Sequence, residues 1–409
     1  MIRLLRIALR CVMTASFALA ASAALAAEVG VADDTILIGA HGPITGGATF
    51  LGLGGRAGAE LAYKEINDAG GIYGRKLKMI FEDDGFSPSR ALAAVKKLVE
   101  QDKVFMINGL SGSNPTLGTI EYLRQAKVPA YITIASAPPV THPFNRYLFR
   151  GATTETVRFG ELNAEFMIDF LQLQRIAIVS GVEENLKTEA DQTISMLDKW
   201  YKMKTVMRAE FKVGDKDFTP QLLKVKESNA DYIFVVGQTP EASIIIRQAR
   251  ELGLRQPIQV APSSLDNALI ANLGPNAEGV MGLWGAGAFL DSHNPDMLKF
   301  RGSWAKMNPN APKGRPNLFD VWGYTEVYVI AEGLRKAGRD LTRDKFINAL
   351  ESLKDYRVSD IATPRSFANW HHIGNLRQTI MVVVAGHWVP LRWDPMRLSE
   401  VLANYKNEK

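Results

Sequence analysis

The sequence has almost no cysteine, and its first residues explain the one it has. Cys11 begins an uncharged apolar run that follows Arg3, Arg6 and Arg10 and closes on the small-x-small motif Ala24-Leu25-Ala26. A basic segment, a short apolar stretch and such a motif predict a signal peptide over residues 1–26, cleaved near Ala26. A membrane anchor needs about 20 apolar residues, and this Ala-rich run is shorter. We therefore expect export to the periplasm.

Removal of this segment changes two bulk properties of the 409-residue chain. No cysteine remains, which excludes disulfides, zinc–thiolate sites and a cysteine nucleophile. The formal charge of +5 loses three arginines and no acidic residue, which leaves +2. Because the remaining Lys and Arg are interspersed with Asp and Glu, we expect no nucleic-acid partner. No later stretch approaches membrane-spanning length.

Motifs for catalysis and for metal binding are also lacking. The six histidines show no metal-ligand spacing, and the adjacent pair His371-His372 is expected to lie in a loop or at the surface. The run Glu82-Asp83-Asp84 is compatible with acid–base or cation chemistry, but its position before a helix favours helix capping. There is no Gly-x-Ser-x-Gly elbow and no Walker A loop. We expect no metal and no cofactor.

Short apolar runs alternate with helical patterns along the chain, which predicts α/β lobes with parallel sheets. Strands are expected at residues 35–40, 77–82, 104–108, 130–133, 175–180, 205–211, 232–236 and 258–261, and a closing pair at 377–385 and 388–391. Helices are expected at residues 57–69, 88–99, 115–125, 156–171, 186–200, 221–227, 241–252, 295–307, 321–336 and 342–353. The pattern restarts after Arg150, which predicts two similar lobes.

Loops rich in glycine and hydroxyl residues follow three of the expected strands, at residues 43–49, 109–114 and 133–138. In an open α/β sheet, ligands bind outside the carboxyl ends of the strands. Ordinary helix capping would explain one such loop, whereas three at one edge favour a site for an anion, most simply a carboxylate. The glycine run at 52–58 is only a weak match to the dinucleotide-binding motif Gly-x-Gly-x-x-Gly, because its third glycine falls one position late. Glycines there would also allow backbone amides to approach a ligand.

On these residues the chain resembles the leucine/isoleucine/valine-binding family of periplasmic solute-binding proteins that serve ABC importers. The resemblance spans nearly the whole chain after residue 26. Its motifs are Ile36-Leu37-Ile38-Gly39 with Thr45-Gly46, Asn67-Asp68-Ala69-Gly70-Gly71-Ile72-Tyr73-Gly74-Arg75-Lys76-Leu77, Asp83-Asp84, Arg175-Ile176-Ala177-Ile178-Val179, Asp215-Lys216-Asp217-Phe218 and Arg247-Gln248-Ala249-Arg250.

The resemblance implies a type I periplasmic-binding fold, with two Rossmann-like lobes joined by a three-crossover hinge that closes on ligand. Lobe 1 would comprise residues 29–152 plus 284–360, and lobe 2 residues 153–283 plus 361–409. Such a protein binds a small solute without chemistry and delivers it to ABC permease subunits in the membrane. We expect it to act as a monomer and not as an enzyme.

Family site residues can be carried over position by position. The carboxylate clamp falls on Ser113 and Ser136, and the carbonyl that receives the ligand ammonium falls on Ile134. The first-loop aromatic position falls on Leu51, beside Phe50. Aromatic positions of the second lobe fall on Asn185 and Gln238. The acidic partner of the ammonium falls near Pro262, which carries no charge, although Glu183, Glu184 or Asp266 could take its place.

Leaving a buried ammonium without a carboxylate costs several kcal/mol. We therefore expect a carboxylate-bearing ligand that lacks an α-amino group, such as an aromatic or aliphatic acid or an amide, with a branched-chain amino acid as the alternative. Phe50, Trp322 and Tyr324 are candidate apolar walls, although the last two are equally compatible with the core. A secreted α/β enzyme and a ligand sensor for a receptor are the rival functions.

Overall fold

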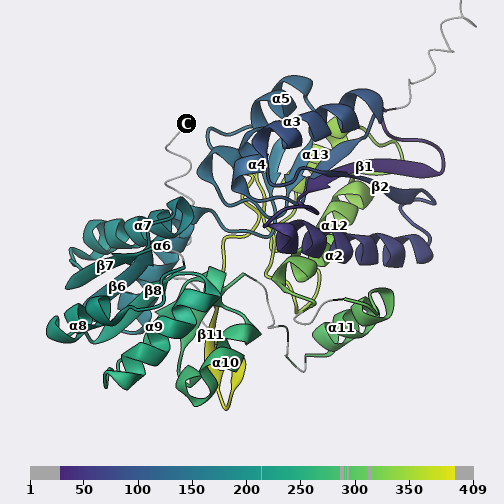
Figure 1. Cartoon of the computed structure of the whole chain (residues 1–409). Coiled ribbons are helices and arrows are strands. Elements are labelled where there is room, and N and C mark those ends of the chain that lie inside the picture. Colours follow the sequence, from purple (N-terminus) through teal and green to yellow (C-terminus); the bar gives the residue numbers. More distant parts are fainter. Residues whose placement is uncertain are drawn as a thin grey trace, which may run out of the picture.

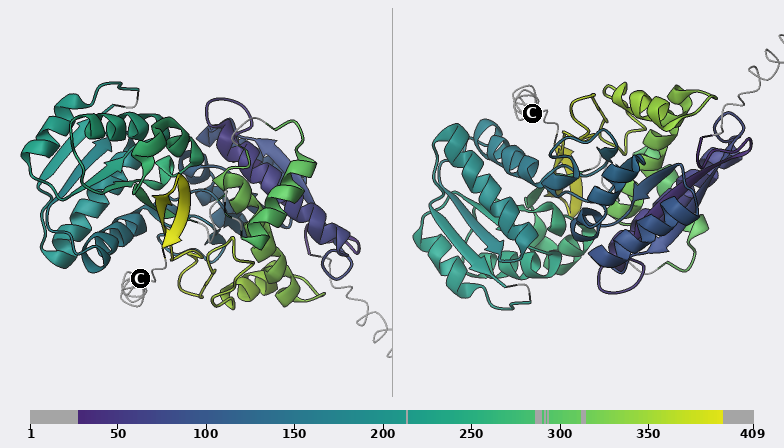
Figure 2. Two further views of the ribbon diagram at one scale, coloured as in Figure 1. Left: turned by 90° about the horizontal axis from the view of Figure 1, so that it is seen from below. Right: turned by 90° about the horizontal axis from the view of Figure 1, so that it is seen from above.

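The structure is a computed structural model that describes residues 28–212, 214–285, 290, 292, 294–311 and 315–391. The predicted signal peptide lies outside these residues. The chain forms two α/β lobes joined by extended segments (Figure 1). The two further views show each sheet with helices on both of its faces (Figure 2). No helix of the described part is long and apolar enough to span a membrane.

Lobe 1 is built on a five-stranded parallel sheet in the order β2-β1-β3-β4-β5. Its strands are β1 (Thr35–Gly42), β2 (Lys76–Asp83), β3 (Met106–Gly109), β4 (Ala130–Ile132) and β5 (Leu148–Arg150). Its helices are α2 (Thr49–Asp68), α3 (Pro88–Lys96), α4 (Ser113–Leu117), α5 (Ile120–Ala126), α11 (Pro295–Met307), α12 (Leu318–Ala337) and α13 (Arg343–Glu351). Three of these helices therefore return from late in the sequence.

Lobe 2 is built on a seven-stranded sheet in the order β12-β11-β10-β9-β8-β6-β7. Its strands are β6 (Ile176–Gly181), β7 (Met207–Phe211), β8 (Tyr232–Val236), β9 (Ile258–Val260), β10 (Met281–Trp284), β11 (Thr379–Val384) and β12 (His387–Leu391). Its helices are α6 (Thr156–Glu165), α7 (Glu184–Tyr201), α8 (Thr219–Glu227), α9 (Thr239–Glu251) and α10 (Asn267–Leu273). The last two strands run antiparallel, as the expected closing pair predicts.

Burial on both faces explains why the central strands are almost wholly apolar. Strands β6 and β8 are buried over their full length, as expected for parallel strands that helices cover on both sides. In lobe 1, one sheet face packs against α2 and α12, and the other packs against α3 and α5. Parallel strands place their carboxyl ends at one edge of each sheet, so each lobe carries one loop-rich edge.

The chain crosses between the lobes three times: after β5, after β10 and before β11. The first and third crossovers are joined side by side. Arg150 N–H donates to the His372 carbonyl and Gly374 N–H to the Arg150 carbonyl, both at 2.8 Å. The Asn375 Nδ2 amide donates to the Ala152 carbonyl at 2.7 Å. The two-lobe α/β prediction is confirmed, while the exact lobe boundaries stay a prediction.

The adjacent histidines lie in a loop, which is one of the two expected placements, but they do not lie at the surface. His371 and His372 lie in the third crossover, which is a loop, but both are buried. The His372 ring stacks on Phe149 at 3.6 Å between centroids, and its Nε2 lies 3.1 Å from Glu351 Oε1. Burial lowers the pKa of His371 to about 4, which favours a neutral ring at this buried position. The pair therefore belongs to the packing of the hinge and not to the surface.

Candidate functional site

Two serines meet at the loop-rich edge of lobe 1. Ser113 is the first residue of α4, directly after the extended Gly112, and Ser136 follows β4. The Ser113 Oγ accepts hydrogen bonds from the backbone N–H of Ser136 at 3.2 Å and of Ala137 at 3.1 Å. An oxygen that accepts two amides still has its own hydrogen to donate. The structure thus brings the two predicted clamp residues together.

Ile134 lies between these serines and the helix layer of lobe 1. Its side chain is buried, and its Cδ1 lies 3.1 Å from where a Cβ on Gly55 of α2 would stand. The side chain therefore belongs to the core. Within the described part of the chain, no hydrogen bond ends on the Ile134 carbonyl oxygen. That oxygen is the atom the family resemblance assigns to the ligand.

Aromatic rings line the start of α2 and α12. Phe50 is exposed and meets Phe319 edge to face, with 5.6 Å between ring centroids. Phe319 meets Trp322 in the same way at 5.5 Å. Trp322 is buried, and its Nε1 donates to the Gly285 carbonyl at 3.2 Å, at the second crossover. Tyr324, in contrast, packs in the core and donates to Glu65 at 2.8 Å.

The loop-rich edge of lobe 2 carries neutral residues at the predicted positions. Gln238 precedes α9 and Pro262 follows β9; both side chains are half-buried. The hydroxyls of Ser263 and Ser264 donate to the Gly237 carbonyl at 2.7 and 2.6 Å, which ties the two loops together. Asn185 lies in the first turn of α7, and its side chain is outside the described residues.

Of the acidic residues considered as replacements near Pro262, Asp266 is already engaged. One of its carboxylate oxygens accepts Leu269 N–H at 2.8 Å as the cap of α10, and the other accepts the Thr239 hydroxyl at 2.7 Å. Glu183 directly precedes α7, and the side chain of Glu184 is outside the described residues. Ser113 and Ser136 follow strands of the lobe 1 sheet, whereas Gln238 and Pro262 follow strands of the lobe 2 sheet, so the two half-sites lie on separate lobes.

The family of the chain follows from its sequence and agrees with this geometry. The sequence profile of the periplasmic binding protein family matches residues 35–386. The chain belongs to this family. Among curated relatives, the Leu-, Ile-, Val-, Thr- and Ala-binding protein of Pseudomonas aeruginosa is 27% identical over 365 residues, which cover 88% of this chain and 92% of that one. The resemblance stated from the motifs is therefore confirmed.

Solved structures of periplasmic binding proteins share the fold. A putative branched-chain amino acid ABC transporter protein from Rhodospirillum rubrum superposes with a TM-score of 0.75 and 20% identity, covering 87% of this chain and 100% of that one. A fatty acid ABC transporter substrate-binding protein from Thermomonospora curvata gives 0.71 and 21%, covering 91% and 96%. At these identities the likeness establishes the fold, which confirms the type I architecture.

The glycine run at residues 52–58 serves helix packing in this periplasmic binding protein. The run lies wholly inside α2, because this helix begins at Thr49 and not at the expected residue 57. A Cβ on Gly58 would stand 1.9 Å from the Asp320 carbonyl oxygen, and one on Gly323 would stand 2.1 Å from the Gly55 carbonyl oxygen. The glycines therefore let α2 and α12 cross closely. This packing, and not a nucleotide, explains the run.

Buried polar residues near the strand ends were missed by sequence reasoning. Asn108 is the next-to-last residue of the apolar strand β3, and its Oδ1 accepts the Thr133 hydroxyl at 2.9 Å. His41 lies near the end of β1 and meets Asp84 at 2.9 Å, with both side chains fully buried. The signal was a single polar residue near the carboxyl end of an apolar strand. The described residues contain no group of three His, Cys, Asp or Glu that could hold a metal ion.

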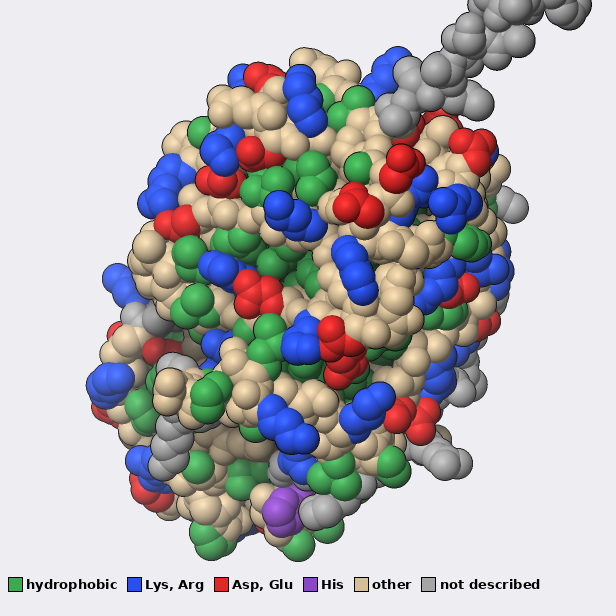
Figure 3. Space-filling model, turned by 90° about the vertical axis from the view of Figure 1, so that its right-hand side faces the viewer, with side chains coloured by type: hydrophobic (Ala, Val, Ile, Leu, Met, Phe, Trp, Pro, Cys, Tyr) green, Lys and Arg blue, Asp and Glu red, His purple; other side chains and the backbone are tan. Residues whose placement is uncertain are grey.

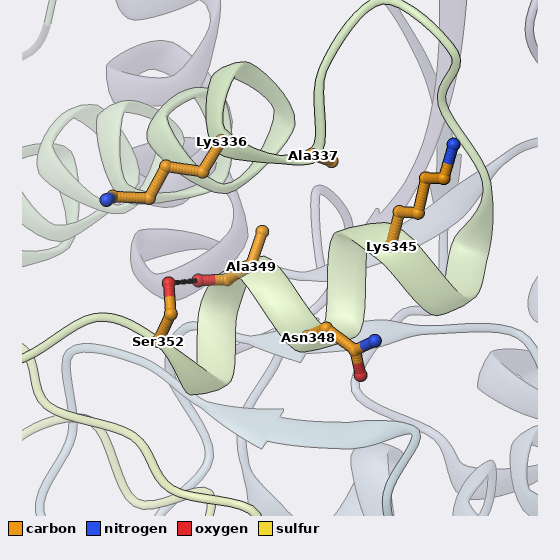
Figure 4. Close-up of a pocket in the computed structure, with 6 residues that line it drawn as sticks. All are labelled: Lys336, Ala337, Lys345, Asn348, Ala349 and Ser352. Atoms are coloured by element: carbon orange, nitrogen blue, oxygen red, sulfur yellow. Dashed lines mark hydrogen bonds between the residues drawn. The ribbon is translucent and has the colours of Figure 1, made fainter.

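A depression on lobe 1 lies away from both half-sites. It is lined by residues from the end of α12 and from α13 (Figure 4): Lys336, Ala337, Lys345, Asn348, Ala349 and Ser352. The only contact drawn among them is the Ser352 hydroxyl donating to the Ala349 carbonyl at 2.7 Å. Trp322 lies at the other end of α12, so this depression is not part of the candidate site.

Proposed function

We propose that this chain is the extracytoplasmic substrate-binding component of an ABC importer, which captures a small carboxylate-bearing solute by hinge closure. Family membership supports a binding role, and relatives named for amino acid and fatty acid binding support an acid as the ligand. The observation that carries the proposal is the Ser113 hydroxyl. Two amides orient its oxygen, so that its hydrogen is left for a ligand oxygen.

The ligand we favour is an acid or amide without an α-amino group. A charged ammonium enclosed between the lobes requires an anionic partner, and its loss costs several kcal/mol. At the predicted position the chain has Pro262, and Gln238 beside it is neutral. The Asp266 carboxylate is engaged on both oxygens. The exposed Phe50 and the half-buried Leu51 offer apolar surface near the clamp.

Calorimetric titration of the chain from residue 27 onward tests this proposal. The probes are leucine, benzoate, hexanoate and butyramide, with Ser113→Ala as the variant and Ser352→Ala as a control on the far side of lobe 1. We expect an acid without an amino group to bind, and Ser113→Ala to weaken it about tenfold or more. Tight binding of leucine alone would contradict the ligand assignment.

The rival functions have distinct signatures. Conversion of any bound probe to product by the purified protein would favour a secreted enzyme, whereas we expect unchanged ligand to be recovered. Uptake of the ligand by cells that express the neighbouring permease, and its loss in cells lacking this chain, would separate transport from sensing for a receptor. We also propose that the protein is periplasmic and monomeric, which cell fractionation and the mass of the purified protein in solution would test.

A further inference from the structure

Asp83 holds the first loop of lobe 1 from the neighbouring strand. One of its carboxylate oxygens accepts Ile44 N–H at 2.9 Å, and the other accepts the Thr45 hydroxyl at 2.6 Å. Within the described part of the chain, these are the hydrogen bonds that join residues 43–47 to another segment. The loop leads directly into Phe50 and Leu51 at the start of α2. Its position therefore depends on one carboxylate.

The same carboxylate also fixes its own turn. Asp83 accepts Gly85 N–H at 3.0 Å and the Arg90 guanidinium at 2.7 Å. Although partial burial acts to raise it, the hydrogen bonds from Thr45, Ile44, Gly85 and Arg90 hold the pKa of Asp83 well below its usual range. The side chain is thus ionised and fully used as an acceptor. It caps no helix, which corrects the capping expected from the sequence.

Asp84 points in the other direction and reaches the serine clamp through Phe86. Its Oδ1 accepts Phe86 N–H at 2.8 Å, while its Oδ2 meets His41. Phe86 has φ of +59°, a left-handed conformation that is uncommon for an aromatic residue. Its ring lies 2.7 Å from where a Cβ on Gly112 would stand, so Phe86 packs on Gly112.

Gly112 connects this packing to the binding residues. It directly precedes Ser113, and the Leu51 Cδ1 lies 3.5 Å from the same Cβ position. Phe86, Leu51 and Gly112 therefore form one contact beneath the clamp. A side chain at position 112 would displace the Phe86 ring, which explains why glycine occupies it. Strained residues of this kind persist where the surrounding structure requires them.

We propose that Asp83 and Asp84 are positioning residues of the binding site: Asp83 sets the first loop, with its apolar wall, and Asp84 sets the serine clamp through Phe86. The two adjacent carboxylates project to opposite sides of the β2 terminus, as side chains of consecutive residues in an extended strand do. Neither needs to touch the ligand. This inference rests on the proposed function for its effect on affinity, but not for its effect on the loops.

Hydrogen exchange of the ligand-free chain from residue 27 onward tests the loop positions. Asp83→Ala should speed exchange in peptides covering residues 43–50 about tenfold, because Ile44 and Thr45 lose their acceptor. Asp83→Asn keeps one acceptor oxygen and should give a smaller effect. Asp68→Asn, in an exposed pair with Lys64, should change neither loop. Unchanged exchange at 43–50, or an equal rise throughout lobe 1, would overturn the role of Asp83.

The proposed role of Asp84 is tested at Phe86, because Asp84→Asn would also disturb the fully buried pair that Asp84 forms with His41. Phe86→Gly keeps the left-handed backbone, which glycine adopts freely, and removes only the ring. We expect faster exchange at residues 110–114 and unchanged exchange at 43–45. Exchange at 110–114 equal to that of the unmodified chain would overturn the role of Asp84.

Affinity for the same four probes links both arms to binding. Any probe that binds the unmodified chain should bind Asp83→Ala and Phe86→Gly about tenfold more weakly. Unchanged affinity would overturn the positioning role even where the loops exchange faster. If no probe binds the unmodified chain, the proposed function is contradicted, and the exchange measurements still decide whether the two carboxylates hold the loops.

Discussion

At the scale of single residues, the proposed binding site depends on whether each polar group still has a hydrogen-bond donor or acceptor available for a ligand. Ser113 shows this most clearly, because its oxygen accepts two amides, and among the described residues no hydrogen bond uses its hydroxyl hydrogen. Pro262 shows the opposite case, since its side chain offers no polar atom where the family resemblance places an acid. We therefore expect ligand preference to depend on two features: the hydrogen-bond donors of the clamp in lobe 1, and the lack of an acidic side chain at position 262 in lobe 2.

An acidic side chain at position 262 should restore the partner for a ligand ammonium that the family resemblance places there. Pro262→Glu places a carboxylate at the first position of a short 3₁₀ turn. We expect leucine to bind about tenfold more tightly and benzoate more weakly, because an ammonium gains a partner and a second carboxylate repels the acid. Calorimetry with both probes measures the change. Pro262→Ala is the control, and an equal gain of leucine affinity there would contradict the electrostatic explanation.

A second residue-scale prediction concerns Glu189 in α7, which is buried and accepts a hydrogen bond from Asn163 Nδ2 at 3.4 Å. Burial raises the pKa of Glu189 from 4.5 to about 7, although the Asn163 hydrogen bond acts to lower it. Between those two values the folded chain keeps a proton that the unfolded chain has lost. Stability therefore falls as pH rises from about 4.5 to about 7.

Glu189→Gln removes this dependence while keeping an oxygen for Asn163. We expect equal free energies of unfolding near pH 4 and a gain of up to about 3 kcal/mol for the variant at pH 8. Urea unfolding at the two pH values measures it. Glu121→Gln, which changes an exposed carboxylate, should show no such difference between the two pH values. The same gain for Glu189→Gln at both pH values would exclude titration as its cause.

At the scale of elements, α2 and α12 cross closely in lobe 1. The N-terminal parts of these two helices carry the aromatic side chains Phe50, Phe319 and Trp322 beside the candidate half-site. Gly58→Ala should lower the free energy of unfolding by about 3 kcal/mol or more, since the new Cβ would stand 1.9 Å from the Asp320 carbonyl oxygen. Gly302→Ala, in α11, meets nothing within 4 Å and should be stabilising by up to about 1 kcal/mol. Destabilisation of Gly302→Ala by the same amount as Gly58→Ala would contradict the packing explanation, because helix propensity favours alanine at both positions.

The same elements show what sequence reasoning can and cannot supply. The apolar runs at 35–40 and 232–236 predicted β1 and β8, because strands buried on both faces need unbroken apolar side chains. The helix was expected to begin at residue 57, whereas α2 begins at Thr49 and includes the glycine run, although glycine disfavours helices locally. The close contact with α12 outweighs that preference, and this partner lies more than 250 residues away. Local patterns cannot report such a contact.

The candidate site could be predicted only in part. The loops that carry Ser113, Ser136 and Ile134 were selected because loops after parallel strands share an edge, and the family resemblance assigned these three residues; their binding role stays a prediction. The contacts of Asp83, Asp84 and Phe86 were not predicted, because a carboxylate before a helix has the same sequence signature whether it caps that helix or accepts hydrogen bonds from another loop. The strands β5 and β10 were also missed.

At the scale of the whole molecule, two features bear on function: the distribution of surface charge and the connection between the lobes. On the face shown in Figure 3, Lys and Arg are interspersed with Asp and Glu, without a patch of one sign. The lobes are linked by crossovers that hydrogen-bond to one another, and Trp322 of lobe 1 reaches the second crossover at Gly285. Such a hinge favours rigid-body motion of two lobes over local folding.

Closure of the hinge on ligand should make the molecule more compact. Because the half-sites lie on separate lobes, a ligand held by Ser113 and Ser136 gains contacts to lobe 2 only if the lobes approach, so binding shifts the population toward a closed form. We expect the radius of gyration measured by small-angle X-ray scattering to fall when the probe that binds most tightly is added. Ser113→Ala should stay extended at the same ligand concentration, whereas Leu223→Ala, which changes an exposed residue of α8, should close normally. Tight binding without compaction would place the ligand on one lobe and contradict capture between two.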